Sequence, residues 1–304
     1  MDFVQLISKS FQITLKHRVL WIFGVVLAIV GGFPNAFNFS FNFTSDFNSF
    51  ESEPPKIFSS LESIKYIDST SIIMLIIVAL LVLVVITFLT TYLQFWSQAA
   101  LLSQTLSAIH AKAATFKEGK EIGEKFFWRF FGFRILLGLI VIPIVLLFIL
   151  FPLLLFLVGL TPFAIFFGVI EIIIFIIGII VYTISASIVS EFGLREMVEK
   201  DLGVVDSIRF GWELFKNNLG DSLLVWLVSV AAGFITIFPI LISAAILAPL
   251  GIGLFFINPW LIAIPIALFI VAFLIIGGVW NVFLAAYWGL AYNVLVNKGG
   301  VNTD

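Results

Sequence analysis

The stretch Phe166–Ile177, FFGVIEIIIFII, consists of apolar residues around a single carboxylate, Glu171. It lies within a longer apolar run, residues 162–185, and about 18 to 20 such residues suffice to cross the hydrocarbon core of a bilayer as a helix. This run has no polar face to present to water, so it predicts a helix that lies in a membrane. A charged group at the bilayer centre costs roughly 2.5–3.5 kcal/mol, so we expect Glu171 to be neutral and to face the protein interior.

The composition of the whole chain extends this prediction. Of 304 residues, 62% are hydrophobic and 11% are charged, and the mean hydropathy is +1.19. Soluble domains carry about 25% charged residues, because their surface must be covered by polar groups. We therefore predict an all-α polytopic membrane protein with one transmembrane domain over residues 1–304. Its six predicted spans are at about 19–36, 71–93, 135–160, 162–185, 222–248 and 260–284.

The basic residues predict the orientation of the chain. Fourteen of the sixteen Lys and Arg residues fall on one side of the predicted spans, and only Lys56 and Lys65 fall on the other. These two lie in a predicted external loop, residues 34–70, beside five acidic residues. The positive-inside rule then places both termini in the cytoplasm, in a plasma or inner membrane. The first span could instead be a secretory signal peptide, but no small-residue cleavage site follows it, so we expect a retained helix.

Three inner segments mix charged and aromatic residues and then lead directly into a span. They are residues 8–24 (SKSFQITLKHRVLWIFG), 123–138 (GEKFFWRFFGFRILLG) and 206–226 (DSIRFGWELFKNNLGDSLLVW). This arrangement predicts three helical hairpins, each entered by an amphipathic helix at the cytoplasmic membrane surface.

The third of these helices has the clearest pattern. Asp206 or Ser207 is a suitable N-cap. Ile208, Trp212 and Phe215 share one helical face. The opposite face carries Arg209, Glu213 and Lys216. We expect this helix to anchor the protein at the interface through Trp212, and the alternative is a docking surface for lipid headgroups or a partner.

Glu171 needs a hydrogen-bond partner if it is buried. It lies nine residues beyond Pro162, or about 14 Å along a helix, which is near the bilayer midplane. Thr236 in the fifth predicted span is at a similar depth, and Pro239 cannot donate to the carbonyl of Ile235. We therefore expect Glu171 to form a hydrogen bond near Ile235 or Thr236.

A second group of polar residues gathers at the inner ends of three predicted spans. These residues either line a cytoplasmic vestibule or pack as small and polar residues between helices, and packing is the simpler interpretation. The group comprises Gln94, Ser97, Gln98, Ser185, Ser187, Asn281, Tyr287 and Asn293.

Two stretches resemble a known family. They are residues 195–223, REMVEKDLGVVDSIRFGWELFKNNLGDSL, and residues 10–32, SFQITLKHRVLWIFGVVLAIVGG. Both are similar to a broad, largely uncharacterised prokaryotic family of six-helix membrane proteins. That family includes the membrane domain attached to some glycerophosphodiester phosphodiesterases. The family's catalytic chemistry belongs to a separate soluble barrel, and the longest soluble stretch here, of about 37 residues, cannot form one. The resemblance therefore implies the membrane fold without phosphodiester hydrolysis.

The remaining motifs do not support catalysis. The chain has no cysteine, no HExxH and no GxSxG, and its two histidines, His17 and His110, lack metal-ligand spacing. The basic stretch KEGKEIGEK lacks the spacing of a phosphate-binding loop.

We expect no enzyme activity, no cofactor, no metal and no nucleic acid. The expected role is a membrane-organising or accessory one in lipid or envelope function, and the alternative is a transporter or permease that uses Glu171. Membrane lipids are the expected partners, and a protein partner or a second copy of the chain stays open.

Overall fold

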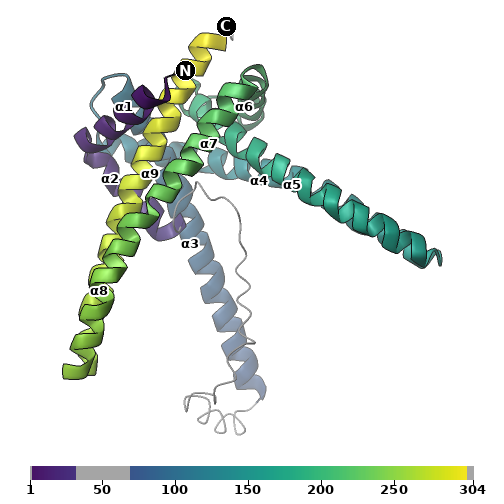
Figure 1. Cartoon of the computed structure of the whole chain (residues 1–304), viewed down its shortest axis with the longest axis horizontal. Coiled ribbons are helices and arrows are strands. Elements are labelled where there is room, and N and C mark those ends of the chain that lie inside the picture. Colours follow the sequence, from purple (N-terminus) through teal and green to yellow (C-terminus); the bar gives the residue numbers. More distant parts are fainter. Residues whose placement is uncertain (1, 32–68, 300–304) are drawn as a thin grey trace. The chain divides into compact units, whose positions relative to one another are not determined.

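The computed structural model describes residues 2–31 and 69–299, and every element in these ranges is helical (Figure 1). Residues 39–92 form one compact unit, of which the described part is the beginning of α3, and the rest of the chain forms the other. The elements are α1 (Phe3–Lys16), α2 (Val19–Gly31), α3 (Ser69–Ile109), α4 (Phe116–Leu157), α5 (Thr161–Lys200), α6 (Val204–Asn217), α7 (Leu219–Ile235), α8 (Ile237–Ile257), the 3-10 helix η4 (Pro259–Ile262) and α9 (Ala263–Gly299).

Five helical stretches are long and apolar enough to cross a membrane, namely α3, α4, α5, α7 with α8, and η4 with α9. A sixth is added if α1 and α2, which meet at a bend of 99°, are counted as one span. The prediction of an all-α, multi-span membrane protein is confirmed at this level. The predicted first span is described only as far as Gly31, and the predicted external loop lies outside the described residues.

Several helices continue well past the apolar runs. α3 extends to Ile109, and α5 extends to Lys200. α4 begins at Phe116, where the Thr115 side chain accepts a hydrogen bond from the Glu118 amide at 3.4 Å. The second predicted surface helix is therefore wrong as a separate element, because α4 runs through it without a break for 42 residues.

The packed core lies in these helix ends and not in the apolar spans. Phe130 and Phe133 of α4, Phe192 of α5 and Leu214 of α6 are fully buried. By contrast, the most apolar 18-residue windows of α4 and α5 contain no buried residue. In these spans α4 lies alongside α5, and α8 lies alongside α9 (Figure 1). Their outward apolar side chains therefore need lipid or another apolar surface to cover them.

The backbones of α2 and α9 touch where they cross. A Cβ atom on Gly24 would lie 2.3 Å from the carbonyl oxygen of Gly278, so only glycine fits. Asn281 donates from Nδ2 to the Gly24 carbonyl at 3.1 Å, and Ser97 donates from Oγ to the Phe23 carbonyl at 2.6 Å. Small residues with polar side chains beside them are typical of helix contacts in membranes.

Helix α6 packs on α5 through a similar contact. A Cβ on Gly211 would lie 2.5 Å from the Val189 carbonyl oxygen, and one on Gly193 would lie 2.6 Å from that of Ser207. Ser207 is consequently buried and faces α5.

The predicted N-cap of the third surface helix is wrong. The N-cap of α6 is Gly203, and Asp206 lies in the first turn. The face that packs inside comprises Ser207, Gly211, Leu214 and Phe215. Trp212 is half exposed, and Arg209 and Lys216 are also exposed, so these three remain at the surface.

The turn between α5 and α6 is held by α4. Asp201 has a left-handed backbone, with φ of 58°. Its carboxylate accepts from Lys125 Nζ at 2.9 Å and from Arg129 Nη1 at 2.5 Å. Arg129 also donates to the backbone carbonyls of Asp201 and Leu202. These hydrogen bonds hold the pKa of Asp201 below its usual value.

Helix α1 buries Leu6, Ser10 and Thr14 against the protein and leaves an apolar stripe exposed. Ser10 and Thr14 are buried, and each donates to the carbonyl four residues earlier in α1, at 2.6 and 2.8 Å. Val4, Ile7, Phe11 and Leu15 form an exposed stripe along a neighbouring face of the helix. Such a helix suits a membrane surface, because the stripe can enter the acyl boundary.

Candidate functional site

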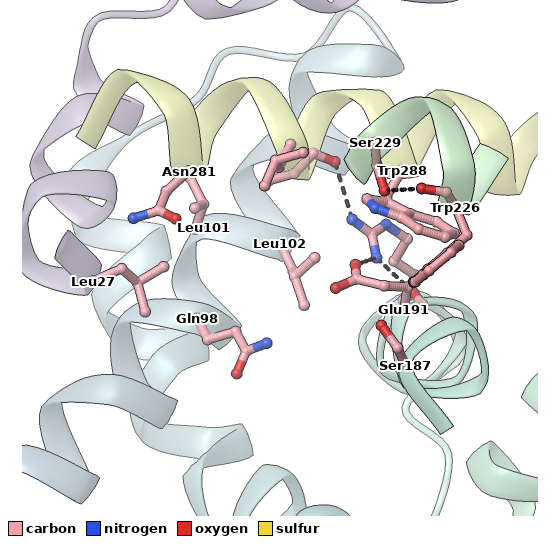
Figure 2. Close-up of a pocket in the computed structure, with 13 residues that line it drawn as sticks. Leu27, Gln98, Leu101, Leu102, Ser187, Glu191, Trp226, Ser229, Asn281 and Trp288 are labelled. Carbon is pink, nitrogen blue, oxygen red and sulfur yellow. Dashed lines mark hydrogen bonds and ion pairs between the residues drawn. The ribbon is translucent and has the colours of Figure 1, made fainter. Parts of the chain in front are cut away.

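A polar cavity of about 50 Å³ lies among five helices, α2, α3, α5, α7 and α9 (Figure 2). A buried water needs about 10–15 Å³, so the cavity has room for a few waters or one small polar group. Its apolar lining includes Leu27, Leu101, Leu102 and Leu284 together with Trp226 and Trp288. Its polar lining comprises Gln98, Ser187, Glu191, Arg195, Ser229 and Asn281.

Arg195 is the central charged residue of this cavity. Only 1% of its side chain is exposed. Its Nη1 donates to the Glu191 carboxylate at 2.6 Å and to the Glu191 carbonyl at 2.5 Å, and its Nη2 donates to the Ala285 carbonyl at 3.1 Å (Figure 2). Burial lowers the pKa of Arg195, and the Glu191 charge opposes this effect. The buried Nε has no hydrogen-bond partner in the ranges that the structure describes.

The Glu191 carboxylate has a second cation nearby. Arg134 of α4 is close enough for the Glu191 charge to raise its pKa, against the larger lowering by burial. Glu191 forms its ion pair with Arg195, and Arg134 is not among the residues that line the cavity.

A second buried acid, Glu196, follows Arg195 directly in the sequence. Glu196 is 1% exposed and forms an ion pair with Lys200 Nζ at 2.8 Å. It also accepts a hydrogen bond from the Tyr292 hydroxyl of α9. Burial, together with Glu196, raises the pKa of Tyr292. Glu196 is thus balanced by its own partners beside the cavity.

The structure divides the predicted inner polar group. Gln98, Ser187 and Asn281 line the cavity. Ser97 and Tyr287 instead bond to backbone carbonyls of neighbouring helices, Tyr287 to that of Val225 at 3.2 Å. Gln94, Ser185 and Asn293 are half-buried and do not line the cavity.

Sequence reasoning missed Glu191, Arg195 and Ser229 as cavity residues. Arg195 was counted only as a charge that sets the orientation of the chain. A signal was present, since Ser187, Glu191 and Arg195 recur every four residues and therefore share one helical face immediately after an apolar span.

The prediction that Glu171 forms a hydrogen bond near Ile235 or Thr236 is wrong. Glu171 lies beside an apolar cavity of about 440 Å³ that is lined only by α4 and α5, including Phe148, Pro152 and Gly168. Its Oε2 is buried and has no partner among the described residues. Although Glu171 and Thr236 were predicted at a similar depth in the membrane, they are not neighbours, because α5 packs against α4 along the spans.

Thr236 satisfies its hydroxyl group locally. Its Oγ1 donates to the Gly233 carbonyl at 2.7 Å. The helix breaks at this residue, between α7 and α8, because Pro239 cannot donate to the Ile235 carbonyl. Thr236 lies beside a different apolar cavity, of about 460 Å³, which α1 and α9 also line.

The helices define a multi-span α-helical membrane protein with a charged cavity at one end of its spans. Over residues 8–297 the chain matches a family of unknown function, DUF7544, and it belongs to that family. No curated protein and no solved structure matches the chain. The expected resemblance to an uncharacterised family is confirmed in this form, and none of the comparisons links the chain to the membrane domain of glycerophosphodiester phosphodiesterases.

Proposed function

We propose that the chain is a non-catalytic protein of the plasma or inner membrane with a membrane-organising or accessory role in lipid or envelope function. In this proposal six spans form three hairpins, and both termini lie in the cytoplasm. Helices α1 and α6 lie at the cytoplasmic surface, where the stripe on α1 and the exposed Trp212 meet lipid. The fourteen-to-two distribution of basic residues supports this orientation.

The position of the polar residues carries the proposal. The charged cavity is at the helix ends, whereas the carboxylate within the spans, Glu171, contacts an apolar cavity. Twenty residues of α5, or about 30 Å, separate Glu171 from Glu191, and the two cavities share no lining residue. A transport pathway gathers polar side chains near the bilayer midplane, so this separation favours an accessory role.

One observation favours the alternative, a transporter or permease for a small solute or lipid. The buried Oε2 of Glu171 has no partner in the described part of the chain, and an unpaired carboxyl group within a span is a typical mark of a coupling site. In this alternative a proton or a solute binds at Glu171.

Native mass spectrometry of the gently extracted protein separates the two roles. Wild type is compared with Glu171→Gln, and Glu124→Gln, an exposed carboxylate on α4, serves as the matched control. The accessory role predicts the same lipid adducts and the same stability in all three proteins. A stoichiometric solute or lipid that is lost only in Glu171→Gln would overturn it in favour of transport.

The orientation has its own test. The chain has no cysteine, so single-cysteine variants can be made without removing any native residue of that type. We expect a membrane-impermeant maleimide to label Ser52→Cys in intact cells and Lys117→Cys only after permeabilisation. The reverse labelling would refute the proposed orientation.

A further inference from the structure

The charged cavity lies where the apolar spans meet their polar ends. Ser187 follows the predicted span 162–185 by two residues, and Asn281 lies near the end of the predicted span 260–284. Trp226 and Trp288 line the same cavity, and tryptophan is enriched at the membrane–water boundary. In the proposed membrane placement, the cavity is therefore at the depth of the lipid headgroups.

The charges in the lining of this cavity cancel. Its ionisable side chains are Arg195 and Glu191, and they form an ion pair at 2.6 Å. Neither an anion nor a cation would meet an excess of the opposite charge there. The cavity therefore suits an uncharged polar group.

Several polar groups in the lining have unused hydrogen-bonding capacity. Gln98 is 9% exposed, and its side-chain amide forms no hydrogen bond with another described residue. The Ser187 hydroxyl likewise has no partner in the described ranges. The Glu191 carboxylate accepts from Arg195 through Oε2, which leaves Oε1 to accept from a ligand.

These groups select a ligand that both donates and accepts hydrogen bonds. Figure 2 shows the ends of the Gln98 and Glu191 side chains extending toward the space between them. The amide can donate and accept, whereas a carboxylate oxygen can only accept. Buried polar groups are normally paired with protein, water or ligand. Hydroxyl groups meet both requirements without adding a charge.

The volume of the cavity fits a short diol. About 50 Å³ corresponds to about three to five waters, at about 10–15 Å³ each. A terminal glyceryl group, with three carbons and two free hydroxyls, replaces that number of waters. Its hydroxyls can reproduce the hydrogen bonds of the waters that leave, and the release of ordered water favours binding. Its carbons meet the leucine and tryptophan side chains of the lining.

The cavity is accessible from outside the protein. The Glu191 side chain is 23% exposed, although its partner Arg195 is buried. A whole lipid is too large for this volume. A headgroup can enter through the Glu191 side while the phosphate and the acyl chains stay outside.

We propose that this cavity binds the terminal glyceryl diol of a membrane lipid. The Gln98 amide donates to one hydroxyl oxygen, Glu191 Oε1 accepts from a hydroxyl group, and the Ser187 hydroxyl is a further partner. This assignment rests on the proposed accessory role in a membrane. The cysteine labelling tests that membrane placement separately, and the assignment does not depend on Glu171.

The test uses the purified full-length protein, delipidated in a glycerol-free buffer. Dihexanoylphosphatidylglycerol is titrated in, and the 1:1 adduct is counted by native mass spectrometry. Dihexanoylphosphatidylpropanol is the matched probe, because it has the same charge, acyl chains and three headgroup carbons without the two hydroxyls. We expect saturable 1:1 binding of the glyceryl lipid and binding of the propanol lipid that is about tenfold to a hundredfold weaker, as expected for the loss of two hydrogen-bonding groups.

A pair of variants on α3 links this difference to the cavity. Gln98→Met keeps the approximate length of the side chain and removes its hydrogen-bonding groups. It should weaken binding of the glyceryl lipid about tenfold and leave binding of the propanol lipid unchanged. Gln94→Met makes the same change one turn earlier on α3, outside the cavity lining, and should leave binding of both lipids unchanged.

A second pair on α5 covers the case in which Gln98→Met does not fold. Ser187→Ala removes a hydroxyl from the lining, whereas Ser185→Ala removes one outside it. We expect weaker binding of the glyceryl lipid in Ser187→Ala and unchanged binding in Ser185→Ala. The unfolding transition of each variant, measured alongside, shows that the compared proteins are folded.

Several results would overturn the proposal. Equal binding of the two lipids by the wild type would show that the hydroxyls are not recognised. The absence of a saturable adduct would leave only water in the cavity. Equal losses in the cavity variants and in their controls would place the lipid elsewhere on the protein. Saturable binding of free glycerol without binding of the glyceryl lipid would refute the lipid as the source of the diol.

Discussion

Replacing Gly24 with alanine should separate α2 from α9. The added Cβ would lie 2.3 Å from the Gly278 carbonyl oxygen, whereas a relaxed carbon–oxygen contact is about 3.3–3.6 Å. The obstacle is a backbone atom and cannot rotate away, so the helices must move apart by about 1 Å. The same movement breaks the hydrogen bond from Asn281 to the Gly24 carbonyl.

The expected loss of stability follows from these two effects. Overpacking costs about 1–3 kcal/mol, and the lost hydrogen bond costs about 0.5–1.5 kcal/mol. Alanine is a better helix former than glycine by about 1 kcal/mol, which offsets part of this loss. The net destabilisation of Gly24→Ala should therefore be about 1–3 kcal/mol.

The matched control is Gly138→Ala on α4, where no heavy atom lies within 4 Å of the added Cβ. Titration of SDS into mixed micelles, followed by tryptophan fluorescence, gives the free energy of unfolding of each protein. Gly24→Ala should unfold at a lower SDS fraction than wild type, and Gly138→Ala should unfold at the same or a higher fraction. If the two variants unfold together, the backbones of α2 and α9 are not in contact and the argument fails.

Two further variants test the helix ends. Asp201→Asn keeps a residue that tolerates the left-handed backbone but loses the charge that Lys125 and Arg129 stabilise. Because the pKa of Asp201 is lowered, its contribution is present above the ordinary value of 3.8 and is lost as the pH falls through the lowered pKa. Thermal unfolding should therefore show a less stable variant at pH 7, with the difference vanishing in acid, and a gap that is constant with pH would contradict this. Tyr292→Phe removes the donor to buried Glu196 and should cost about 1–3 kcal/mol in the SDS titration, whereas unchanged stability would show that this hydrogen bond is absent.

The sequence located the ends at which α4 and α5 meet better than the other ends of these two helices. The predicted span 135–160 ends three residues after α4 does, and the span 162–185 begins one residue after α5 does. The C-terminal end of α5 was placed about 15 residues too early, at residue 185 instead of Lys200. Hydropathy detects the part of a helix that lipid covers. Whether the helix continues beyond it depends on side-chain packing, as at Phe192, which composition does not reveal.

The neighbours of buried polar residues were harder to predict. Depth along a span can be counted from the sequence, and Glu171 and Thr236 do lie at similar counts. Which helices lie side by side depends on close contacts such as Gly24 with Gly278, and one sequence alone does not identify such pairs. The Glu191–Arg195 ion pair could be predicted from the i,i+4 spacing of the two residues. The burial of the pair could not, because it depends on α3, α7 and α9 together.

Helix α5 runs without a break from Thr161 to Lys200, so a tilt at one of its ends displaces the other end. Arg195 and Glu171 lie on one helix, 24 residues or about 36 Å apart. A tilt of about 5° about the charged end would move the backbone at Glu171 by about 3 Å. By contrast, the helix is broken at Thr236 between α7 and α8. Helix α8 can therefore tilt without moving Ser229 in the cavity wall. A change in the charge of the cavity would therefore displace the apolar part of α5 and would not displace α8.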